Sequence, residues 1–460
     1  MAKDDPPDER RRRARSRVPA GRLERLGRIG WMAGEAALGG VAERARRLAG
    51  GEAGTTSALF TGENARRLAK RLSRMRGAAM KLGQLLSLEG DDFLPPEVAE
   101  ALALLRSDAD AMPDEQLRAV LRAEYGEGWE ARFAHFDPEP IAAASIGQVH
   151  EARLADGREL ALKIQYPGVA ESIGSDVGNL LAALRIARLL PRDLDLAALA
   201  GEVERQLREE ADYAGEAARL ARYRDLLDSD PVFVVPRVHA ELTTPRILAM
   251  DRLYGLPLED LCGPQHPQQR RDAVAAQLYR LLFRELFEFG FMQTDPNFAN
   301  YLWIPDGERL GLIDLGAGRE VPLRLRRLYA RLIQAGIDAD RRGVREASLA
   351  IGLYTQGERE DRVEALVDMM MLACEAFAGD APHDFAGSGH PARMRELGMD
   401  LALGKGFWRP PPVDSLYLHR KLGGTYLLAA RLHARVNLRE LILPFLRAQE
   451  GRGSGADPRG

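Results

Sequence analysis

Cysteine and long apolar runs are scarce in this sequence, and each absence excludes a class of protein. Only two of the 460 residues are cysteines, Cys262 and Cys374, and they lack the paired spacing of a zinc site or a disulfide framework. The apolar stretch 29–42 is interrupted by Glu35, and no run reaches the roughly 18 apolar residues of a membrane-spanning helix. We therefore predict no disulfide, no transmembrane segment and a reducing, intracellular compartment.

An excess of charge of one sign is also missing. The 65 Lys and Arg residues nearly balance 68 Asp and Glu residues, so we predict no nucleic-acid partner. No apolar region with a small-residue cleavage site follows the arginines at 10–13, which argues against a secretory signal. The composition, 45% hydrophobic and 29% charged, is typical of a folded chain. The high content of Ala, Arg and Gly suggests a bacterial source with a GC-rich genome.

The length predicts two or three packed units, because domains usually contain about 100–200 residues. Composition divides the chain into a disordered basic tail (1–20), an amphipathic segment (21–60), a helical extension (61–128), a lobe of sheet and helix (129–252), a helical lobe (253–449) and a disordered tail (450–460). Arginines flank the small and apolar residues of segment 21–60, which is typical of a helix at a membrane interface. A solvated helix docked on the protein is the alternative.

Short β-like runs in the middle of the chain predict a sheet. They occupy residues 148–154, 159–165, 232–238 and 246–250, around helical patterns near 170–190 and 197–227. Helical periodicity also covers most of 63–90 and 96–125. Beyond Leu253 the pattern is helical except for the apolar runs 301–304 and 310–314. The predicted fold class is therefore α+β.

A lysine in one predicted strand gives the first functional signal. Residues 160–163 read Leu-Ala-Leu-Lys, which matches the V-A-I-K strand whose lysine contacts ATP phosphates. The preceding residues fit the G-x-G-x-x-G-x-V phosphate loop, with alanine at its first two glycine positions: Ala142, Ala143, Ala144, Ser145, Ile146, Gly147, Gln148 and Val149. An ordinary alanine-rich turn is the alternative, but the position ahead of Lys163 favours a nucleotide-binding loop.

Two acidic motifs further along complete a set that phosphoryl transfer requires. Asp295 and Asn300 have the spacing of Asp and Asn in H-R-D-L-x-x-x-N, and Asp314-Leu315-Gly316 stands where D-F-G would. We interpret Asp295 as a catalytic base or water-orienting group, and Asn300 and Asp314 as ligands of Mg²⁺. Taken singly, Asp295 could cap a helix and Asp314 could begin a turn. Their order along the chain favours the kinase-like interpretation.

The lysine of such a site pairs with an acid on a helix. Residues 201–227 are predicted to form one long helix on which Asp212 and Glu216 share a face, and we assign Glu216 to Lys163. A solvated acidic face is the alternative. Three further candidates for nucleotide contact lie where the predicted sheet gives way to the helical lobe: Met250, Asp251 and Leu253.

Two further motifs make the pattern more specific than that of kinases in general. Residues 81–84 read Lys-Leu-Gly-Gln, a K-x-G-Q motif, and residues 210–212 read Glu-Ala-Asp, an E-x-D motif. With the alanine-rich loop and segments 163–169 and 293–300, the sequence from Ala65 to Gly318 resembles the UbiB/ADCK (AarF) family of atypical kinases.

The resemblance implies a bilobal protein-kinase-like fold with an N-terminal helical extension and a mostly helical C-lobe. It implies ATP and Mg²⁺ as cofactors, and K-x-G-Q helices that cover the active site and block ordinary protein phosphorylation. The residues implied in this regulatory gate are Lys81, Gln84, Glu210 and Asp212. The sequence agrees, because helix is predicted soon after Gly316, with no activation segment and no A-P-E motif.

The implied function is that of an ATPase or small-molecule kinase that supports the biosynthesis of ubiquinone or other isoprenoid lipids. The expected partners are ATP and ADP, an anionic membrane, quinone precursors and quinone-biosynthesis enzymes. The expected location is cytoplasmic, peripheral on the inner face of the plasma membrane. A nucleotide-regulated scaffold without turnover and a conventional protein kinase are the alternatives. The intact acidic motifs weigh against the first, and the missing activation segment weighs against the second.

Overall fold

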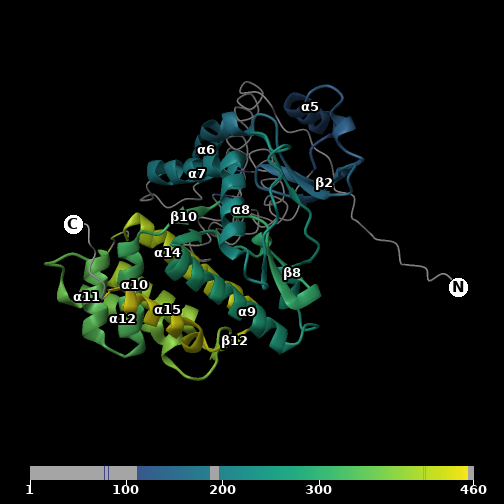
Figure 1. Ribbon diagram of the computed structural model, residues 1–460. Coiled ribbons are helices and arrows are strands. Elements are labelled where there is room, and N and C mark those ends of the chain that lie inside the picture. The colour runs from purple at the N-terminus through teal and green to yellow at the C-terminus, as the bar shows by residue number, and fades with distance from the viewer. Residues whose placement is uncertain are drawn as a thin grey trace, which may run out of the picture. The chain divides into compact units, whose positions relative to one another are not determined.

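The computed structural model describes residues 77, 81, 111–186, 196–407, 409 and 411–453. They belong to two compact units (Figure 1). One unit contains the described residues up to Ala218 together with Arg237–Arg252, and the other contains Arg219–Pro236 and the described residues from Leu253 onward. The predicted tail 1–20, the segment 21–60 and most of the extension 61–128, Gln84 included, lie outside the described residues.

The first unit contains a four-stranded antiparallel sheet in the order β1-β2-β3-β5. The strands are β1 (His135–Ala143), β2 (Gly147–Arg153), β3 (Glu159–Gln165) and β5 (Ile247–Asp251). Leu160, Leu162 and Ile164 of β3 belong to one buried apolar cluster, together with Leu117 and Leu121 of helix α5 (Asp114–Tyr125). Because side chains alternate along a strand, Lys163 lies on the opposite face of the sheet.

The helices of the first unit correct one prediction. They are η3 (Trp129–Arg132), α6 (Val169–Ile186), α7 (Leu196–Ala211) and the beginning of α8 (Tyr213–Leu227). The single long helix predicted over 201–227 is wrong, because the chain breaks at Asp212 between α7 and α8. Asp212 Oδ1 accepts a hydrogen bond from the N–H of Gly215 at 2.9 Å. This is the contact of a residue that caps the start of a new helix.

Three of the predicted strands are confirmed, as β2, β3 and β5. Strand β1 was not predicted, because Pro138 and Pro140 interrupt its pattern; the pairing with β2 shifts register on both sides of Pro140. The prediction of a strand over 232–238 is largely wrong, since only Phe233–Val234 forms a strand, β4. Pro236, which has no N–H to donate, follows it closely.

The second unit has a small four-stranded sheet in the order β4-β9-β8-β6. Its other strands are β6 (Leu256–Pro257), β8 (Tyr301–Ile304) and β9 (Arg309–Leu312), so the predicted run 301–304 is confirmed and the run 310–314 ends as a strand at Leu312. Two short pairs accompany this sheet. In them, β7 (Phe291–Gln293) pairs with β10 (Gly318–Glu320), and β11 (His383–Asp384) pairs with β12 (Arg435–Val436).

Helices make up most of the second unit, as predicted. The α-helices are α9 (Gln268–Phe283), α10 (Leu323–Ile337), α11 (Arg341–Ile351), α12 (Glu360–Ala378), α13 (His390–Met399), α14 (Val413–Arg431) and α15 (Leu438–Gly453). Short turns are η4 (Leu258–Cys262), η6 (Phe298–Asn300) and η7 (Asp306–Glu308), and the π-helical segments are η5 (Arg284–Phe289) and η8 (Asp400–Gly404).

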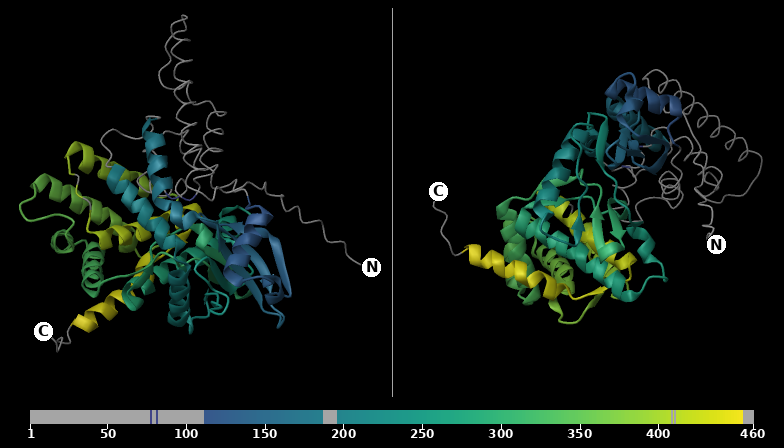
Figure 2. Two further views of the ribbon diagram at one scale, coloured as in Figure 1. Left: turned by 90° about the horizontal axis from the view of Figure 1, so that it is seen from above. Right: turned by 45° about the vertical axis from the view of Figure 1, so that its right-hand side comes forward.

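Prolines mark the start of several helices in this unit. Helices α9, α10 and α14 begin directly after Pro267, Pro322 and Pro412, which have the extended backbone that is typical of an N-cap residue. Helix α15 lies beside α9 and α12 (Figures 1 and 2). Within the described part of the chain, no helix combines the length and apolar character needed to cross a bilayer.

The close approach of β2 to β3 at Gly147 gives a stability prediction. A Cβ at position 147 would overlap the carbonyl oxygen of Ile164 and lie 2.9 Å from Tyr213 Oη. Because neither strand can move without disturbing the sheet, Gly147→Ala should lower the free energy of unfolding by about 1–3 kcal/mol, measured by urea denaturation.

Gly178→Ala serves as the control for this substitution. Gly178 is exposed on α6 and has open space around its α-carbon, so the added methyl group should raise stability by up to about 1 kcal/mol. Equal stability of Gly147→Ala and the wild type would contradict the close approach.

Candidate functional site

The clearest polar feature of the first unit is a buried ion pair between Lys163 and Glu216. The Nζ atom of Lys163 lies 2.7 and 2.9 Å from the two carboxylate oxygens of Glu216. Only 6% and 1% of the two side chains are exposed. Strand β3 directs Lys163 away from the apolar cluster, and Glu216 lies in the first turn of α8. The ion pair expected from the sequence is therefore present.

The alanine-rich segment forms a tight turn rather than a free loop of eight residues. Ala142 and Ala143 are the last residues of β1, and Gly147 is the first residue of β2. The N–H of Ala144 donates to the carbonyl oxygen of Gly147 at 2.9 Å and closes the turn. In the sheet, Val149 pairs directly with Lys163. The segment thus lies next to Lys163, but only Ala144, Ser145 and Ile146 are outside the strands.

Gln148 is turned away from the lysine face. Its Oε1 atom accepts from the N–H of Met112 at 2.8 Å, and its Nε2 atom lies 2.7 Å from His150 Nε2. These contacts lie on the side of the apolar cluster, because Gln148 pairs with Ile164 across the sheet. Its amide is thus already bound to Met112 and His150, and its assignment to the nucleotide stays a prediction.

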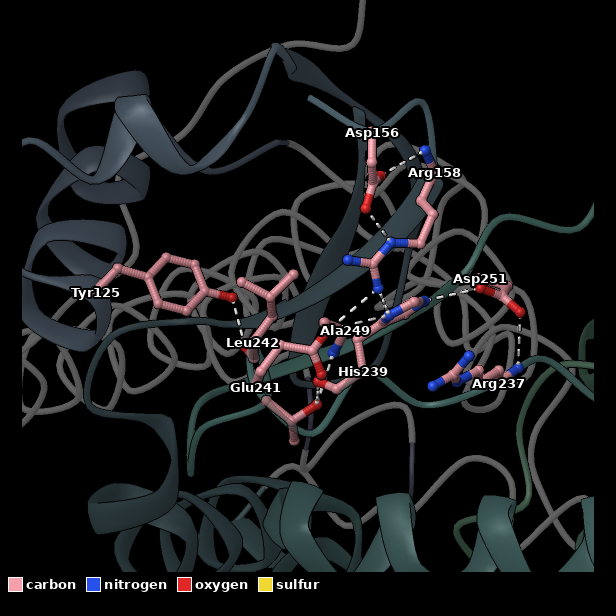
Figure 3. Close-up of polar contacts among 10 residues, drawn as sticks. Tyr125, Asp156, Arg158, Arg237, His239, Glu241, Leu242, Ala249 and Asp251 are labelled. Atoms are coloured by element: carbon pink, nitrogen blue, oxygen red, sulfur yellow. Dashed lines mark hydrogen bonds and ion pairs between the residues drawn. The ribbon is translucent and has the colours of Figure 1, made fainter. Parts of the chain in front are cut away.

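The three candidates at and just after the end of β5 also point in different directions. Met250 pairs with Ala161 and shares the face of Lys163. Asp251 points to the other face, where its carboxylate lies 2.8 Å from His239 Nε2 and accepts from the N–H of Arg237 at 3.2 Å (Figure 3). Its carboxylate is thus bound within the first unit, and its assignment to the nucleotide stays a prediction. Leu253, in the second unit, lies against Gly311 of β9.

The predicted gate residues are partly brought together. Lys81 Nζ lies 3.9 Å from Glu210 Oε2, and the hydroxyl of Ser145 donates to Oε1 of the same carboxylate. Glu210 thus connects the K-x-G-Q lysine to the alanine-rich turn. Asp212, the second acid of the E-x-D motif, is exposed and caps α8, which carries Glu216.

In the second unit, one short segment brings Asp295 and Asn300 together. The Nδ2 atom of Asn300 donates to the carbonyl oxygen of Asp295 at 2.8 Å and lies 3.4 Å from its Oδ2. Asn297 caps the turn η6 by accepting from the N–H of Ala299 at 3.1 Å. The chain therefore returns on itself between Asp295 and Asn300.

Asp314 is held next to this segment by the backbone. The N–H of Ile313 donates to the carbonyl oxygen of Asn300 at 3.0 Å. Gln293 Nε2 donates to the carbonyl oxygen of Asp314 at 2.9 Å, and Asp314 Oδ1 accepts from the N–H of Gly316 at 3.1 Å. The three candidates of the second unit, Asp295, Asn300 and Asp314, thus lie on neighbouring segments.

The donor set of this half fits a magnesium ion bound together with phosphates. Because the Nδ2 atom of Asn300 faces Asp295, its Oδ1 atom is the group left for a metal. Mg²⁺ prefers oxygen ligands and usually takes one or two from the protein and the rest from phosphates and water. Accordingly, the described residues contain no group of three or more His, Cys, Asp or Glu side chains that could hold a metal alone.

A buried cluster around Glu285 supports the segments of the second unit that carry Asp295 and Asp314, and it was not predicted from the sequence. Glu285 Oε1 accepts from Tyr223 Oη at 2.8 Å and from the N–H of Gln293 at 3.2 Å, and its Oε2 lies 3.0 Å from Lys421 Nζ. Burial lowers the pKa of Lys421, but Glu285 and the nearby Tyr301 hydroxyl outweigh it and raise that pKa above its usual value. The sequence of η5 contains two glutamates, Glu285 and Glu288, and no motif distinguished the buried one.

A second residue that sequence reasoning missed is Arg420 of α14. Its Nη2 atom donates to Asp295 Oδ1 at 2.8 Å. No motif surrounds Arg420, and more than a hundred residues separate it from Asp295. Nothing in the sequence could have paired them.

Comparison with known proteins shows the family of this chain. Residues 104–348 match the ABC1 atypical kinase-like domain. The chain belongs to this family. The match includes Lys163, Glu216, Asp295, Asn300 and Asp314 and ends before α14. The resemblance to UbiB/ADCK proteins and the α+β kinase-like fold are thereby confirmed.

Similar proteins extend over most of the chain. "Atypical kinase COQ8B, mitochondrial" of Rattus norvegicus is 41% identical over 433 residues, which are 93% of this chain and 81% of that protein. "Atypical kinase COQ8, mitochondrial" of Saccharomyces cerevisiae is 36% identical over 93% of this chain and 85% of its own. A solved structure, "The complex structure of Rv3197-erythromycin from Mycobacterium tuberculosis", is 26% identical with a TM-score of 0.57, over 83% of this chain and 95% of its own.

The buried Glu285–Lys421 pair gives a second stability prediction. Lys421→Met removes the cation and leaves an uncompensated buried carboxylate, which should cost about 3–5 kcal/mol of unfolding free energy. Adding Glu285→Gln should recover part of this loss, because the amide carries no charge. Urea denaturation of the single and double variants measures both effects.

Lys405→Met is the matched control. Lys405 pairs with Asp400 at 3.5 Å in a more exposed setting, so its loss should cost less than about 1 kcal/mol. If Lys421→Met were no more costly than Lys405→Met, the supporting role of the buried pair would be wrong.

His419 of α14 gives a prediction for the dependence of stability on pH. Its Nε2 atom lies 2.7 Å from Tyr329 Oη of α10, and burial lowers its pKa from 6.5 to about 4. Between these values the unfolded chain binds a proton that the folded chain does not, so stability should fall as pH drops from about 7 to 4, by at most roughly 3 kcal/mol.

Urea denaturation at several pH values tests this slope. His419→Gln should flatten it, whereas His135→Gln, at an exposed position of β1, should leave it unchanged. A His419→Gln protein with the slope of the wild type would show that other groups cause the pH dependence.

Proposed function

We propose that this protein binds Mg²⁺–ATP and transfers the γ-phosphoryl group to water or a small molecule. The observation that carries the proposal is the buried pair of Lys163 and Glu216. Desolvation makes a buried ion pair a poor source of stability. A lysine fixed by a carboxylate on the face of the sheet opposite the apolar cluster is, however, suited to meet phosphate oxygens, and kinases use this pair for that purpose.

The second unit supplies the groups that the reaction itself needs. We assign Asp295 as the base or water-orienting group, and Asn300 and Asp314 as the ligands of Mg²⁺, acting on the same nucleotide as Lys163. When bound, the ion would neutralise charge on the β- and γ-phosphates. The hydrogen bonds among Asp295, Asn300 and the strand that leads to Asp314 support this assignment. They fix the three residues relative to one another before any ligand binds.

A peptide acceptor is disfavoured by the chain after Gly316. Only strand β10 separates this glycine from α10, which begins at Leu323, so there is no activation segment on which a peptide could lie. In the first unit, the contact of Lys81 with Glu210 supports the proposed gate. We therefore assign a small acceptor or water rather than a protein.

We place this activity in the biosynthesis of ubiquinone or a related isoprenoid lipid. Support comes from the membership of the atypical kinase family and from the names of the relatives, atypical kinases of the COQ8 type. The proposed partners are an anionic membrane surface, quinone precursors and the enzymes that modify them. ATP hydrolysis at that surface would then help to expose the lipid precursor.

Hydrolysis of ATP by the purified full-length protein tests the proposal. Turnover is measured with Mg²⁺, with and without phosphatidylglycerol vesicles and a quinone-like phenol. The wild type should hydrolyse ATP, and Asp314→Asn should weaken Mg²⁺-dependent nucleotide binding and lower kcat/KM by about 10²–10³-fold, because one charged ligand is lost.

Asp306→Asn is the control, since it makes the same change at a fully exposed aspartate of the second unit. It should bind and hydrolyse ATP as the wild type does. Undiminished Mg²⁺–ATP binding by Asp314→Asn in a thermal-shift assay would contradict the metal assignment. Tight nucleotide binding without turnover under any condition would instead favour a nucleotide-regulated scaffold.

A further inference from the structure

Helix α14 lies beyond the matched domain, yet one side of it contacts the segment from Asp295 to Asn300. Arg420 pairs with Asp295, Gly424 lies against Pro296, and the guanidinium of Arg431 lies 4.8 Å from the ring centroid of Phe298. The spacings of four and seven residues place these three positions on one face of the helix. The helix therefore follows the candidate catalytic segment over several turns.

Gly424 shows how closely the helix approaches. A Cβ at this position would overlap the ring of Pro296. Glycine inside a helix costs about 1 kcal/mol relative to alanine, and the contact with Pro296 explains why glycine stands here. The approach also brings Arg420, one turn earlier, within reach of the carboxylate.

The pair of Arg420 and Asp295 is well shielded from water. Only 13% and 22% of the two side chains are exposed, so screening of their attraction by solvent is reduced. Among the described residues, the Nε atom of Arg420 is buried and has no hydrogen-bond partner. Asp295 is thus the group that orients the guanidinium, and the guanidinium in turn orients Asp295.

The two oxygens of the Asp295 carboxylate have different contacts. Oδ1 receives the short bond from Arg420, whereas the hydrogen bond recorded for Oδ2 within the described part of the chain is the 3.4 Å contact with Asn300 Nδ2. The segment from Asp295 to Asn300 contains no Lys or Arg of its own. The charge that fixes Asp295 therefore comes from α14.

We propose that Arg420 is a positioning residue that holds Asp295 through Oδ1 and presents Oδ2 to the phosphoryl acceptor. This proposal rests on the proposed function, because it assigns Asp295 a role in ATP turnover. A base or a water-orienting group is effective only when its free oxygen points at the acceptor, and a small misplacement can cost about 10²-fold in rate. In this proposal Arg420 acts through Asp295, which its guanidinium contacts directly.

The test compares ATP turnover by full-length variants. Arg420→Met should lower kcat by about 10- to 100-fold while the KM for ATP changes less than about threefold, and Arg420→Lys, which keeps the charge, should recover part of the rate. In an Asp295→Asn background, Arg420→Met should cost nothing more, because the residue that it positions is already disabled.

Arg341→Met is the matched control, since Arg341 is an exposed arginine of the second unit that pairs with Glu364 and Asp368. It should keep the kcat of the wild type. Thermal unfolding identifies any variant that fails to fold. If Arg420→Met does not fold, the kcat of Arg420→Lys is compared with that of the wild type instead.

Three results would overturn the inference. Unchanged turnover of Arg420→Met would show that Asp295 is positioned without it. Faster turnover would show that Arg420 restrains the site. Equal and additive losses in the wild-type and Asp295→Asn backgrounds would indicate a purely structural helix contact. A wild type that neither binds nor hydrolyses ATP would instead contradict the proposed function itself.

Discussion

Burial of Lys163 against Glu216 is the constraint on which the first unit depends. Two charges removed from water lose so much hydration that they must lie within hydrogen-bond distance. The pleat of β3 turns the lysine away from the apolar cluster, and the break at Asp212 starts the helix that carries the glutamate. The hydrogen bond between Ser145 and Glu210 joins the alanine-rich turn to the same helical region. Strand, turn and helices are thus arranged around one ion pair.

The second unit also contains a buried ion pair, between Glu285 and Lys421. Glu285, fully buried, is balanced by Lys421 and connects through Gln293 to the backbone of Asp314. One residue earlier on α14, Arg420 reaches Asp295. Helix α14, which lies outside the family's matched domain, thus contacts Asp295 through Arg420 and supports the backbone of Asp314 through Lys421, Glu285 and Gln293. Helix α14 therefore supports the proposed reaction centre.

The sequence predicted what depends on neighbouring residues, and it failed where distant ones decide. Strands β2, β3 and β8 follow from local patterns, the motif order pointed to Lys163 and Asp314, and the acidic face of a predicted helix pointed to Glu216. The break at Asp212 was missed because helix propensity alone continues through it. The true directions of Gln148 and Asp251 depend on strand register. Arg420 and Lys421 stand in no motif, so only the packing of α14 places them near Asp295 and Glu285.

The central claim, that Lys163 and Asp314 act on one nucleotide, is tested most directly by an ATP analogue with a lysine-reactive acyl phosphate. Mass spectrometry of the labelled full-length protein identifies the modified lysine. The account predicts Mg²⁺-dependent acylation at Lys163, prevented by excess ATP and strongly reduced in Asp314→Asn. Labelling at other lysines, or at Lys163 with no dependence on Mg²⁺ and Asp314, would contradict it.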